Sequence, residues 1–402
     1  MIYILEAFVE DYLHVLANVN IIKIFKNIHP EQPIFFSSPK KHNDNVRKYF
    51  THAPSNIRFD PFENLTVDTG NIFKRTWLIL SRFFRDIRVL LTTFRRAKAN
   101  DIIVITHIYF TSLVLIKIIK KFYPRKATYL VIHGDVEYVF YPKGMQQKLV
   151  GFFHKLMFKF SCKNFHYIFL TPISKQILVS AKLIKENEGF AIELPTFATE
   201  DLVQIQNTRS QSEIIKIGHI GSAGTRKNVH YMFKVAQELE HLIKNGLIQL
   251  INVGVLEGTI KPFLSPLVID YVDGKINKPL SREQYDVQIS RLDYAVFFYG
   301  QTDFILRSSA AFFDAIFFEK PMIVLKNPFF IEVFDRAGAI GYICEDLDDM
   351  VSLITDLIKS KANHESRYLT FVENIRKYKS SLRIENISDK LGRDFKQQIN
   401  SN

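Results

Sequence analysis

Cysteine is scarce in this chain. The 402 residues include only two cysteines, Cys162 and Cys344, which lie far apart in the sequence. Neither belongs to a Cys-x-x-Cys pair or to a grouping of cysteines and histidines. This pattern argues against a disulfide scaffold and against structural zinc, and it fits a reducing cytoplasm.

Long hydrophobic runs are also missing. No stretch reaches the roughly 18 uninterrupted apolar residues that a membrane-spanning helix needs. The first residues, MIYILEAFVEDYLHVL, contain Glu6, Glu10 and Asp11 and no basic leader, so they do not predict a signal peptide. We therefore expect a cytoplasmic protein, either soluble or peripheral on the inner face of the plasma membrane.

Acidic residues are outnumbered. The chain has 53 Lys and Arg against 41 Asp and Glu, which gives a formal net charge of +12 at pH 7. Such a surplus favours anionic partners, whether phosphorylated ligands, nucleic acid or acidic lipid. The cations are dispersed among apolar helical positions and no RNA- or DNA-binding motif is present, so a basic nucleic-acid-binding protein is the least favoured alternative.

Two segments of the first half combine basic and bulky apolar residues at helical spacing. They are residues 72–98, IFKRTWLILSRFFRDIRVLLTTFRRAK, and residues 143–160, KGMQQKLVGFFHKLMFKF. Basic amphipathic helices of this kind are candidates for contact with an anionic membrane surface. The alternative is that each is an ordinary helix whose apolar stripe packs on a sheet.

Strands and helices alternate along the chain, and the length favours two domains. The pattern predicts an α/β protein with two Rossmann-like, doubly wound parallel sheets, at 1–195 and 208–362, joined by a linker within 191–207. A charged helical segment, 363–402, follows and is expected to pack back on the first domain. The predicted strands are 1–5, 33–38, 101–106, 127–133, 167–171, 214–220, 247–255, 267–272, 294–299 and 321–325. The predicted helices are 9–26, 72–98, 110–121, 145–160, 228–243, 281–291 and 309–318.

Polar residues follow many of these strands. In open α/β sheets, ligands bind beyond the carboxyl ends of the strands, so a cleft between the two domains is the expected site. In the first domain the residues at these ends are Glu6, His107, His133, Gly134 and Asp135, with His14 further along in the predicted helix.

The most informative stretch is 214–232, IIKIGHIGSAGTRKNVHYM. It predicts a buried strand, a glycine-bearing turn that includes Gly221, and a helix start at which Asn228 is the cap. Arg226 and Lys227 stand at that helix start, where unpaired N–H groups and two cations can hold phosphate. The spacing matches neither the dinucleotide fingerprint nor the P-loop.

A family resemblance rests on this stretch together with a later one. IGHIGSAGTRKN (217–228) and FFYGQTDFILRSSAAFFDAIFFEKPMIVL (297–325) resemble the carboxyl-terminal domain of GT-B glycosyltransferases. The resemblance is closest to the family 4 type of bacterial surface-polysaccharide clusters, such as those for lipopolysaccharide or capsule. The first half resembles their acceptor domain in Glu6, His14 and His133-Gly134.

The resemblance implies an activity. It implies a metal-independent, hexosyltransferase-like enzyme that moves a sugar from a nucleotide-diphosphate-sugar to a lipid-linked or polysaccharide acceptor. The first domain would bind the acceptor and the second the donor, with no cofactor besides the nucleotide-sugar substrate. His14 and His107 would lie on the acceptor side.

The resemblance also implies donor-binding residues. Lys227 matches the lysine that steadies the donor diphosphate, whereas Ser222 stands where the family has an arginine. Arg226 and Arg307 are the candidate replacements for that charge. The two family glutamates correspond to Leu306 and Asp314, and Asp314 is the predicted ribose ligand. The remaining implied contacts are Gly221, Ser308 and Ser309 for phosphate and Asp273, Gly274 and Lys275 for the base.

The stereochemistry stays open at this point. If the anomeric centre inverts, Glu6, His133 or Asp135 is the candidate base; if it is retained, no such base is required. The one Asp-x-Asp, starting at Asp346, precedes an apolar run and predicts a helix start, so no metal is expected. Because the family glutamate and arginine are missing, a catalytically degenerate nucleotide-binding or membrane-scaffold protein is the main alternative.

Overall fold

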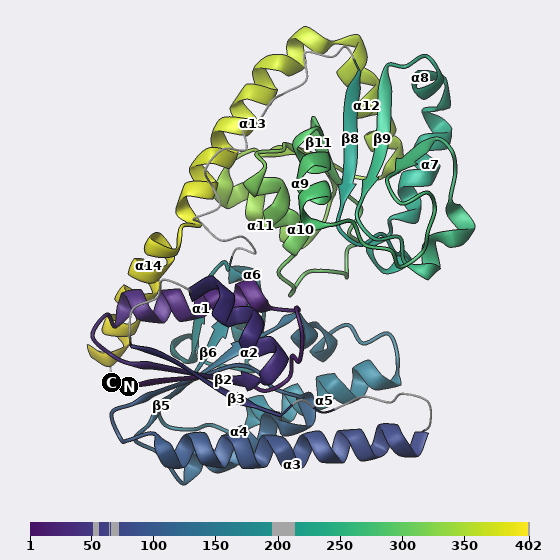
Figure 1. The fold of residues 1–402 in the computed structure, drawn as a ribbon. Coiled ribbons are helices and arrows are strands. Elements are labelled where there is room, and N and C mark those ends of the chain that lie inside the picture. Colours follow the sequence, from purple (N-terminus) through teal and green to yellow (C-terminus); the bar gives the residue numbers. More distant parts are fainter. Residues whose placement is uncertain (51–55, 64, 66–71, 195–213, 401–402) are drawn as a thin grey trace. The chain divides into compact units, whose positions relative to one another are not determined.

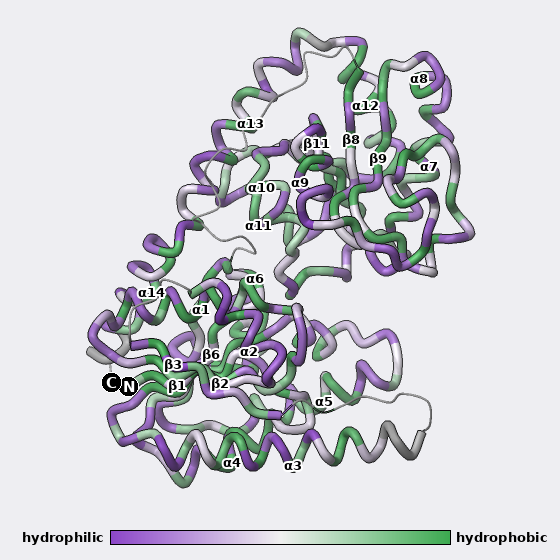
Figure 2. The backbone as a smooth tube through the Cα atoms, in the orientation of Figure 1, coloured by the Kyte–Doolittle hydropathy of each residue, from purple (hydrophilic) through white to green (hydrophobic). Residues whose placement is uncertain are grey.

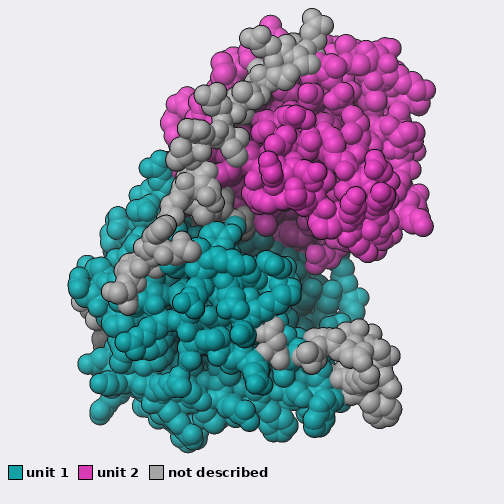
Figure 3. All heavy atoms as spheres, viewed as in Figure 1, with its two compact units in different colours: residues 1–195, 306–308, 383–402 teal, residues 196–305, 309–382 magenta. Residues whose placement is uncertain are grey.

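The computed structural model describes residues 1–50, 56–63, 65, 72–194 and 214–400. The chain forms two compact units (Figure 3). Unit 1 comprises Met1–Pro195, Leu306–Ser308 and Arg383–Asn402, and unit 2 comprises Thr196–Ile305 and Ser309–Leu382.

Unit 1 contains a parallel sheet of seven strands in the order β3-β2-β1-β4-β5-β6-β7. The strands are β1 (Ile2–Glu6), β2 (Ile34–Pro39), β3 (Ile57–Phe62), β4 (Ile102–His107), β5 (Ala127–Ile132), β6 (Phe165–Phe169) and β7 (Gly189–Ala191). β1 is buried along its whole length, as expected for a strand covered on both faces. The order reverses between β1 and β4, which are paired, so ligands are expected at this switch point.

Helices cover both faces of this sheet (Figure 1). They are α1 (Val15–Ile28), α2 (Lys40–Arg47), α3 (Ile72–Arg96), α4 (Leu113–Lys121), α5 (Met145–Lys159), α6 (Pro172–Ser180) and α14 (Ile384–Asn400). α3, α4 and α5 lie side by side on one face, and α1 lies against α14 on the other. Phe395 of α14 packs against Phe25, Tyr129 and Phe190, which anchors the end of the chain in the core of unit 1.

Unit 2 contains a parallel sheet of six strands in the order β10-β9-β8-β11-β12-β13. The strands are β8 (Ile215–Ile220), β9 (Ile248–Val253), β10 (Val268–Asp270), β11 (Tyr294–Phe297), β12 (Met322–Leu325) and β13 (Gly341–Cys344). The order reverses between β8 and β11, which are paired. Unit 2 therefore repeats the switch point of unit 1.

The helices of unit 2 are α7 (His230–Glu238), α8 (Glu240–Lys244), α9 (Arg282–Ser290), α10 (Ala310–Phe317), α11 (Pro328–Ala337), α12 (Leu347–Lys359) and α13 (Lys361–Ser381). Successive residues of β11 alternate between two cores: Ala295 and Phe297 join one, Tyr294 and Val296 the other. This period of two shows that both faces of the sheet are covered. Figure 2 shows hydrophobic stretches along the two sheets, although strands such as β3 and β8 also contain hydrophilic residues.

The predicted fold class, two Rossmann-like parallel sheets, is confirmed. Each predicted strand is present, but α2, β3, α6, β7, α11 and β13 were not predicted. Two predicted helices differ in extent: 9–26 begins only at Val15, and 228–243 begins at His230 and is interrupted at Leu239.

The predicted linker falls mostly outside the described residues. Its first residue, Ala191, ends β7, and Ile192 and Leu194 are buried. The predicted boundaries at 195 and 208 lie outside the described residues. The helical segment 363–402 divides between the units, with α13 in unit 2 and α14 in unit 1.

Candidate functional site

The loops after β8 and β9 approach each other closely in unit 2. Gly221 has φ +90° and Gly254 has φ +139°, values that side-chain-bearing residues rarely adopt. A β-carbon on Gly254 would lie 2.2 Å from the carbonyl oxygen of Gly221. Glycine is therefore required at the carboxyl end of β8.

Arg226 and Lys227 follow this turn in a short 3-10 segment, Thr225–Lys227, and not at a helix start. The predicted helix cap at Asn228 is wrong, because Asn228 is left-handed and its amide donates to the carbonyl of Phe298 at 3.2 Å. Both cations lie over the ring of Phe304, at 5.8 and 5.9 Å from its centre. The segment thus brings two positive charges together beside one aromatic ring.

Lys227 is half-buried and Arg226 is exposed. The Lys227 ammonium lies beside Gly221, 3.7 Å from the point where a β-carbon on that glycine would sit. Burial, and then the neighbouring Arg226, lower the pKa of Lys227 to about 8. An anion bound between these cations would favour the charged ammonium and reverse that shift.

Ser222, which stands at the position of the family arginine, points to an acidic neighbour. Its hydroxyl donates to Glu257 Oε1 at 2.9 Å. Glu257 also partly offsets the lowering of the Lys227 pKa. Sequence reasoning missed Glu257, which lies 35 positions from Ser222 and follows a different strand.

The loop between β11 and α10 contains a strained aromatic residue. Phe304 has φ 59°, a conformation that costs a bulky residue about 1–3 kcal/mol. Its ring stacks on Tyr299 at 4.3 Å, and the Tyr299 hydroxyl bonds to that of Ser309 at 2.7 Å. Ser309 is buried and caps α10 by accepting from the N–H of Phe312, so its hydroxyl is already engaged.

Arg307 and Ser308 belong to unit 1 by their contacts, although the chain reaches them from β11. The Arg307 guanidinium pairs with Glu137 at 3.3 Å and lies over the Tyr138 ring at 4.8 Å. Glu137 also accepts from the N–H of Leu306 at 3.3 Å. Arg307 therefore already has a carboxylate partner within unit 1.

Asp314, the predicted ribose ligand, is almost fully buried on α10. Tyr285 donates to it at 2.9 Å and Arg282 lies 3.7 Å away, both from α9. Burial raises the pKa of its carboxyl. Asp314 therefore links α10 to α9, and its role as the ribose ligand stays a prediction.

The predicted base region adjoins a cavity of about 380 Å³ in unit 2. Asp273 and Gly274 line it, together with Asn252 and Asp270, whereas Lys275 does not. Asp273 and Gly274 are both left-handed, and Asp270 Oδ1 holds the turn by accepting from the N–H of Gly274 at 3.0 Å.

Glu6 ends β1 in unit 1 and is completely buried. Its carboxylate accepts hydrogen bonds from the N–H groups of Phe8 and Val9, the Asn18 amide and the Thr106 hydroxyl, at 3.0–3.2 Å. Burial raises its pKa to about 7, against the lowering effect of these donors. The Glu6 oxygens are thus enclosed by hydrogen-bond donors, and the role of Glu6 as the base stays a prediction.

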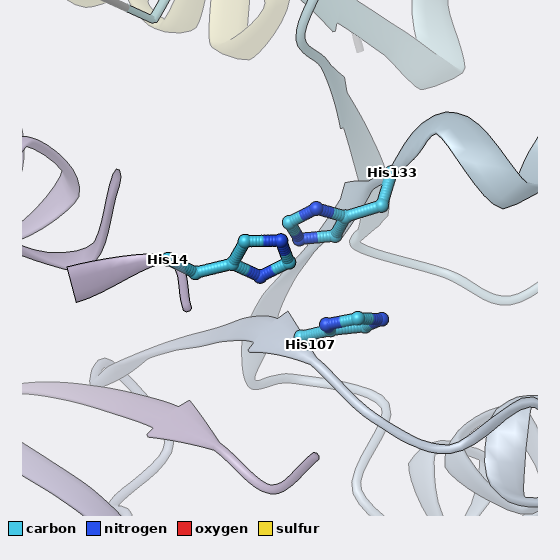
Figure 4. A group of neighbouring side chains, drawn as sticks. All are labelled: His14, His107 and His133. Carbon is cyan, nitrogen blue, oxygen red and sulfur yellow. The ribbon is translucent and has the colours of Figure 1, made fainter. Parts of the chain in front are cut away.

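Three histidines converge above the carboxyl ends of the unit 1 strands (Figure 4). His14 directly precedes α1 with φ 59° and is not inside the helix as predicted; His107 ends β4 and His133 follows β5. The ring centres of His133 lie 4.6 Å from His14 and 4.2 Å from His107. Burial lowers the pKa of all three, to about 3 for His14, so the rings are neutral at neutral pH.

Asp135, the third candidate base, follows His133 in the 3-10 segment Gly134–Val139. Its carboxylate lies 3.6 Å from His154 Nε2 and its side chain is one-third exposed. Of the three candidates, Asp135 is thus the carboxylate that solvent reaches.

Helices α3 and α5 carry exposed apolar side chains on the outer surface of unit 1, where the two basic segments were predicted. They include Trp77, Leu80 and Phe84 of α3 and Met145, Leu149 and Phe152 of α5. The structure does not describe the side chains of residues 72–75. Exposed lysines, Lys148, Lys155 and Lys159, accompany them on α5. None of the described helices combines the length and apolar character needed to span a bilayer.

The Asp-x-Asp prediction is confirmed as a helix start. Asp346 precedes α12, and its side chain accepts from the N–H of Asp349 at 2.9 Å. These carboxylates cap a helix in unit 2.

No family model and no curated protein sequence matches this chain. Solved structures do match over nearly the whole length. WaaG, a glycosyltransferase involved in lipopolysaccharide biosynthesis, has a TM-score of 0.59 at 12% identity, covering 98% of each chain. The sucrose-phosphate synthase of Thermosynechococcus elongatus gives 0.60 at 11% identity, covering 100% of each. The E. coli trehalose-6-phosphate structure bound with UDP-2-fluoro glucose gives 0.65 at 7% identity, covering 99% of each.

The fold is that of GT-B glycosyltransferases. The paired Rossmann-like units of these structures are the architecture found here. The GT-B part of the resemblance is therefore confirmed at the level of fold, and the assignment to family 4 stays a prediction.

Proposed function

We propose that this chain is a glycosyltransferase that moves a sugar from a nucleotide-diphosphate-sugar to a lipid-linked or saccharide acceptor of a bacterial surface polysaccharide. The observation that carries the proposal is the cation pair Arg226 and Lys227 beside the Gly221 turn, at the switch point of unit 2. Likeness in fold to WaaG supports the polysaccharide context.

Sugar transfer leaves negative charge on the departing diphosphate. Lys227 and Arg226 stabilise that charge, and Gly221, which has no side chain, allows a close approach. Preorganised cations suffice for this task, so the diphosphate binds without a metal ion. The nucleotide base occupies the cavity lined by Asp273 and Gly274, with Asn252 at its wall.

The acceptor hydroxyl binds at the carboxyl ends of the unit 1 strands, near His14, His107 and His133. If transfer inverts the anomeric centre, Asp135 or His133 takes the hydroxyl proton, because Glu6 is enclosed. If it retains the centre, His133 orients the acceptor and no base is needed.

The outer surface of α3 and α5 docks on an anionic membrane at its cytoplasmic face, which would bring unit 1 to a lipid-linked acceptor. Exposed aromatic and aliphatic side chains enter the interfacial region while the lysines of α5 meet acidic headgroups. The net charge of +12 has the sign that this occupant requires.

A thermal-shift screen against UDP, GDP, CMP, ADP and their sugar conjugates, without added metal, tests donor binding. A ligand that binds the native state raises the melting temperature by mass action. Lys227→Ala should abolish the shift, whereas Lys234→Ala, an exposed lysine of α7, should keep it. No shift with any nucleotide would contradict the proposal.

Catalytic degeneracy is the second candidate function, because Leu306, at the position of the first family glutamate, is buried and apolar. Donor binding without release of nucleoside diphosphate, with or without acceptor, would favour this alternative.

A further inference from the structure

The histidine cluster of unit 1 has a feature that the proposed function does not use. Among the described residues, His14, His107 and His133 form the one group of three or more potential metal ligands whose ligand atoms lie within 4.8 Å of one another. The three side chains come from different elements and meet above the sheet (Figure 4). The topology of the switch point, not sequence proximity, brings them together.

Two nitrogens of this cluster have no hydrogen-bond partner. Within the described part of the chain, Nδ1 of His14 and Nδ1 of His107 are both buried and unpaired. Buried polar atoms in native proteins are nearly always satisfied, by protein groups, water or an ion. Several other buried polar atoms are also unpaired, but these two lie on adjacent rings and can share one partner that is not part of the polypeptide.

The third ring is held in a defined tautomer. His133 Nε2 lies 2.6 Å from the carbonyl oxygen of Thr106, which can only accept, so Nε2 carries the proton and Nδ1 keeps its lone pair. The Thr106 hydroxyl in turn donates to Glu6. A backbone carbonyl that accepts from the outer nitrogen is the usual second contact of a metal-binding histidine.

We propose that His14, His107 and His133 bind one divalent transition-metal ion of the zinc class. Neutral imidazole is a borderline ligand that suits Zn²⁺, Co²⁺, Ni²⁺ and Cu²⁺ and not Mg²⁺ or Ca²⁺. The site uses no carboxylate: Glu6 is enclosed by its own donors and Asp135 lies against His154.

Binding of one ion requires the three side chains to move. Zinc binds histidine nitrogen at about 2.0–2.1 Å, so nitrogens of a tetrahedral site lie about 3.4 Å apart. The ligand atoms lie within 4.8 Å of one another, and the His133 ring is stacked on the other two rings. Each side chain must therefore shift its nitrogen and turn its ring, so that three in-plane lone pairs meet at one ion.

Three protein ligands leave at least one coordination position open. That is the arrangement of zinc sites that bind a water or substrate oxygen, in contrast to closed structural sites with four protein ligands. The open position would take an acceptor hydroxyl, a statement that rests on the proposed function. Metal binding itself does not rest on it, and it leaves the metal-free diphosphate site of unit 2 unchanged. With its Nδ1 on the metal and its Nε2 protonated, His133 cannot also be the base, so Asp135 is then the base of an inverting transfer.

A cobalt titration tests the site directly. Untagged protein, stripped with a chelator and desalted, is titrated with Co²⁺ while the visible d–d absorption is recorded. We expect saturation at one equivalent, with Zn²⁺ displacing the cobalt. Loss of an outer-shell partner lowers metal affinity by about 10- to 100-fold, and loss of a ligand should cost at least as much. We therefore expect at least this weakening of cobalt binding in each of the variants His14→Ala, His107→Ala and His133→Ala.

The matched control is His241→Ala, which removes an exposed histidine of α8 and should leave the titration unchanged. No saturable binding by the wild type, or equal binding by wild type and all three cluster variants, would overturn the proposal. Metal-free melting curves show whether each variant is folded. Should the variants not fold, X-ray absorption on the zinc-loaded wild type decides: three imidazole ligands support the site, and fewer overturn it.

This result is separable from the donor test. If the wild type shows the nucleotide-induced thermal shift but binds no metal, the metal site alone is contradicted. Metal binding without any nucleotide shift would contradict the glycosyltransferase proposal alone.

Discussion

The two sheets share one topology but differ in the chemistry at their switch points. In each, the strand order reverses beside the first strand of the unit, β1 or β8. The residue after β8 is Gly221, followed by two cations, whereas β1 ends in the enclosed carboxylate Glu6 beneath neutral histidines. The same backbone arrangement thus presents positive charge in unit 2 and uncharged ring nitrogens in unit 1.

This difference teaches that the fold supplies positions and the loops supply function. Both edges contain residues with positive φ close to the site: Gly221 and Asn228 in unit 2 and His14 in unit 1. Glycine allows a ligand to approach the backbone. His14, at φ 59°, instead directs a side chain toward its neighbours.

The largest expected effect comes from removing the charge that distinguishes unit 2. Lys227→Ala should lower turnover by about 100-fold or more, because loss of one preorganised charge-stabilising group costs about 2.7–4 kcal/mol. Release of nucleoside diphosphate, measured with an acceptor extract, checks this. Lys234→Ala is the control, and near-normal turnover in a folded Lys227→Ala protein would remove the basis of the comparison.

The next effect is on stability and concerns the close loop approach of unit 2. Gly254→Ala places a β-carbon 2.2 Å from the Gly221 carbonyl oxygen, so the free energy of unfolding should fall by about 3 kcal/mol. Gly144→Ala in unit 1 is the matched change, since nothing lies within 4 Å of its β-carbon position. Urea denaturation measures both, and equal midpoints would show that the loop is not constrained as described.

Sequence reasoning predicted the sheets better than the site. Runs such as the five buried residues of β1 define strands by their own composition. Some short elements were not predicted, because too few of their residues are apolar to form a recognisable pattern. β7 has only three residues, and α2 is a polar helix with little apolar periodicity.

The side-chain partners could not be predicted, because they come from residues distant in the chain. Glu137 pairs with Arg307 across 170 positions, and Tyr285 reaches Asp314 from another helix. Conversely, the histidines were predicted individually, from their places after strands. Their convergence into one cluster depends on the strand order, which the sequence did not specify.

A third prediction contrasts buried titratable groups of the two units through pH. In unit 1 burial raises the Glu6 pKa from 4.5 to about 7, so between these pH values the folded state binds a proton that the unfolded state has lost. The contribution of Glu6 to the free energy of unfolding therefore falls as pH rises from 4.5 to 7. In unit 2 the His219 pKa is lowered from 6.5 to about 3, so stability falls as pH drops from 6.5 to 3.

Within its pH window, each group should change the free energy of unfolding by at most about 1.4 kcal/mol per pH unit. Urea midpoints across pH, for the wild type, Glu6→Gln and His219→Gln, measure these slopes. The two windows overlap but the slopes have opposite signs, so Glu6→Gln should remove only the fall in stability with rising pH and His219→Gln only the fall with dropping pH. Identical profiles for all three proteins would contradict the assigned protonation states.

The smallest expected effect tests whether the charge of unit 1 is directed at a membrane. The double variant Lys148→Gln and Lys155→Gln removes two exposed lysines of α5. Each lysine should contribute about 1 kcal/mol of binding free energy near an anionic surface, so each loss should lower vesicle affinity by about fivefold. Cosedimentation with phosphatidylserine-containing vesicles at increasing salt measures the loss. The matched pair in unit 2, Lys234→Gln and Lys261→Gln, makes the same change in net charge on another surface. Equal weakening by both pairs would mean that the overall charge, and not the α3–α5 surface, governs binding, because a docked face must depend on its own lysines.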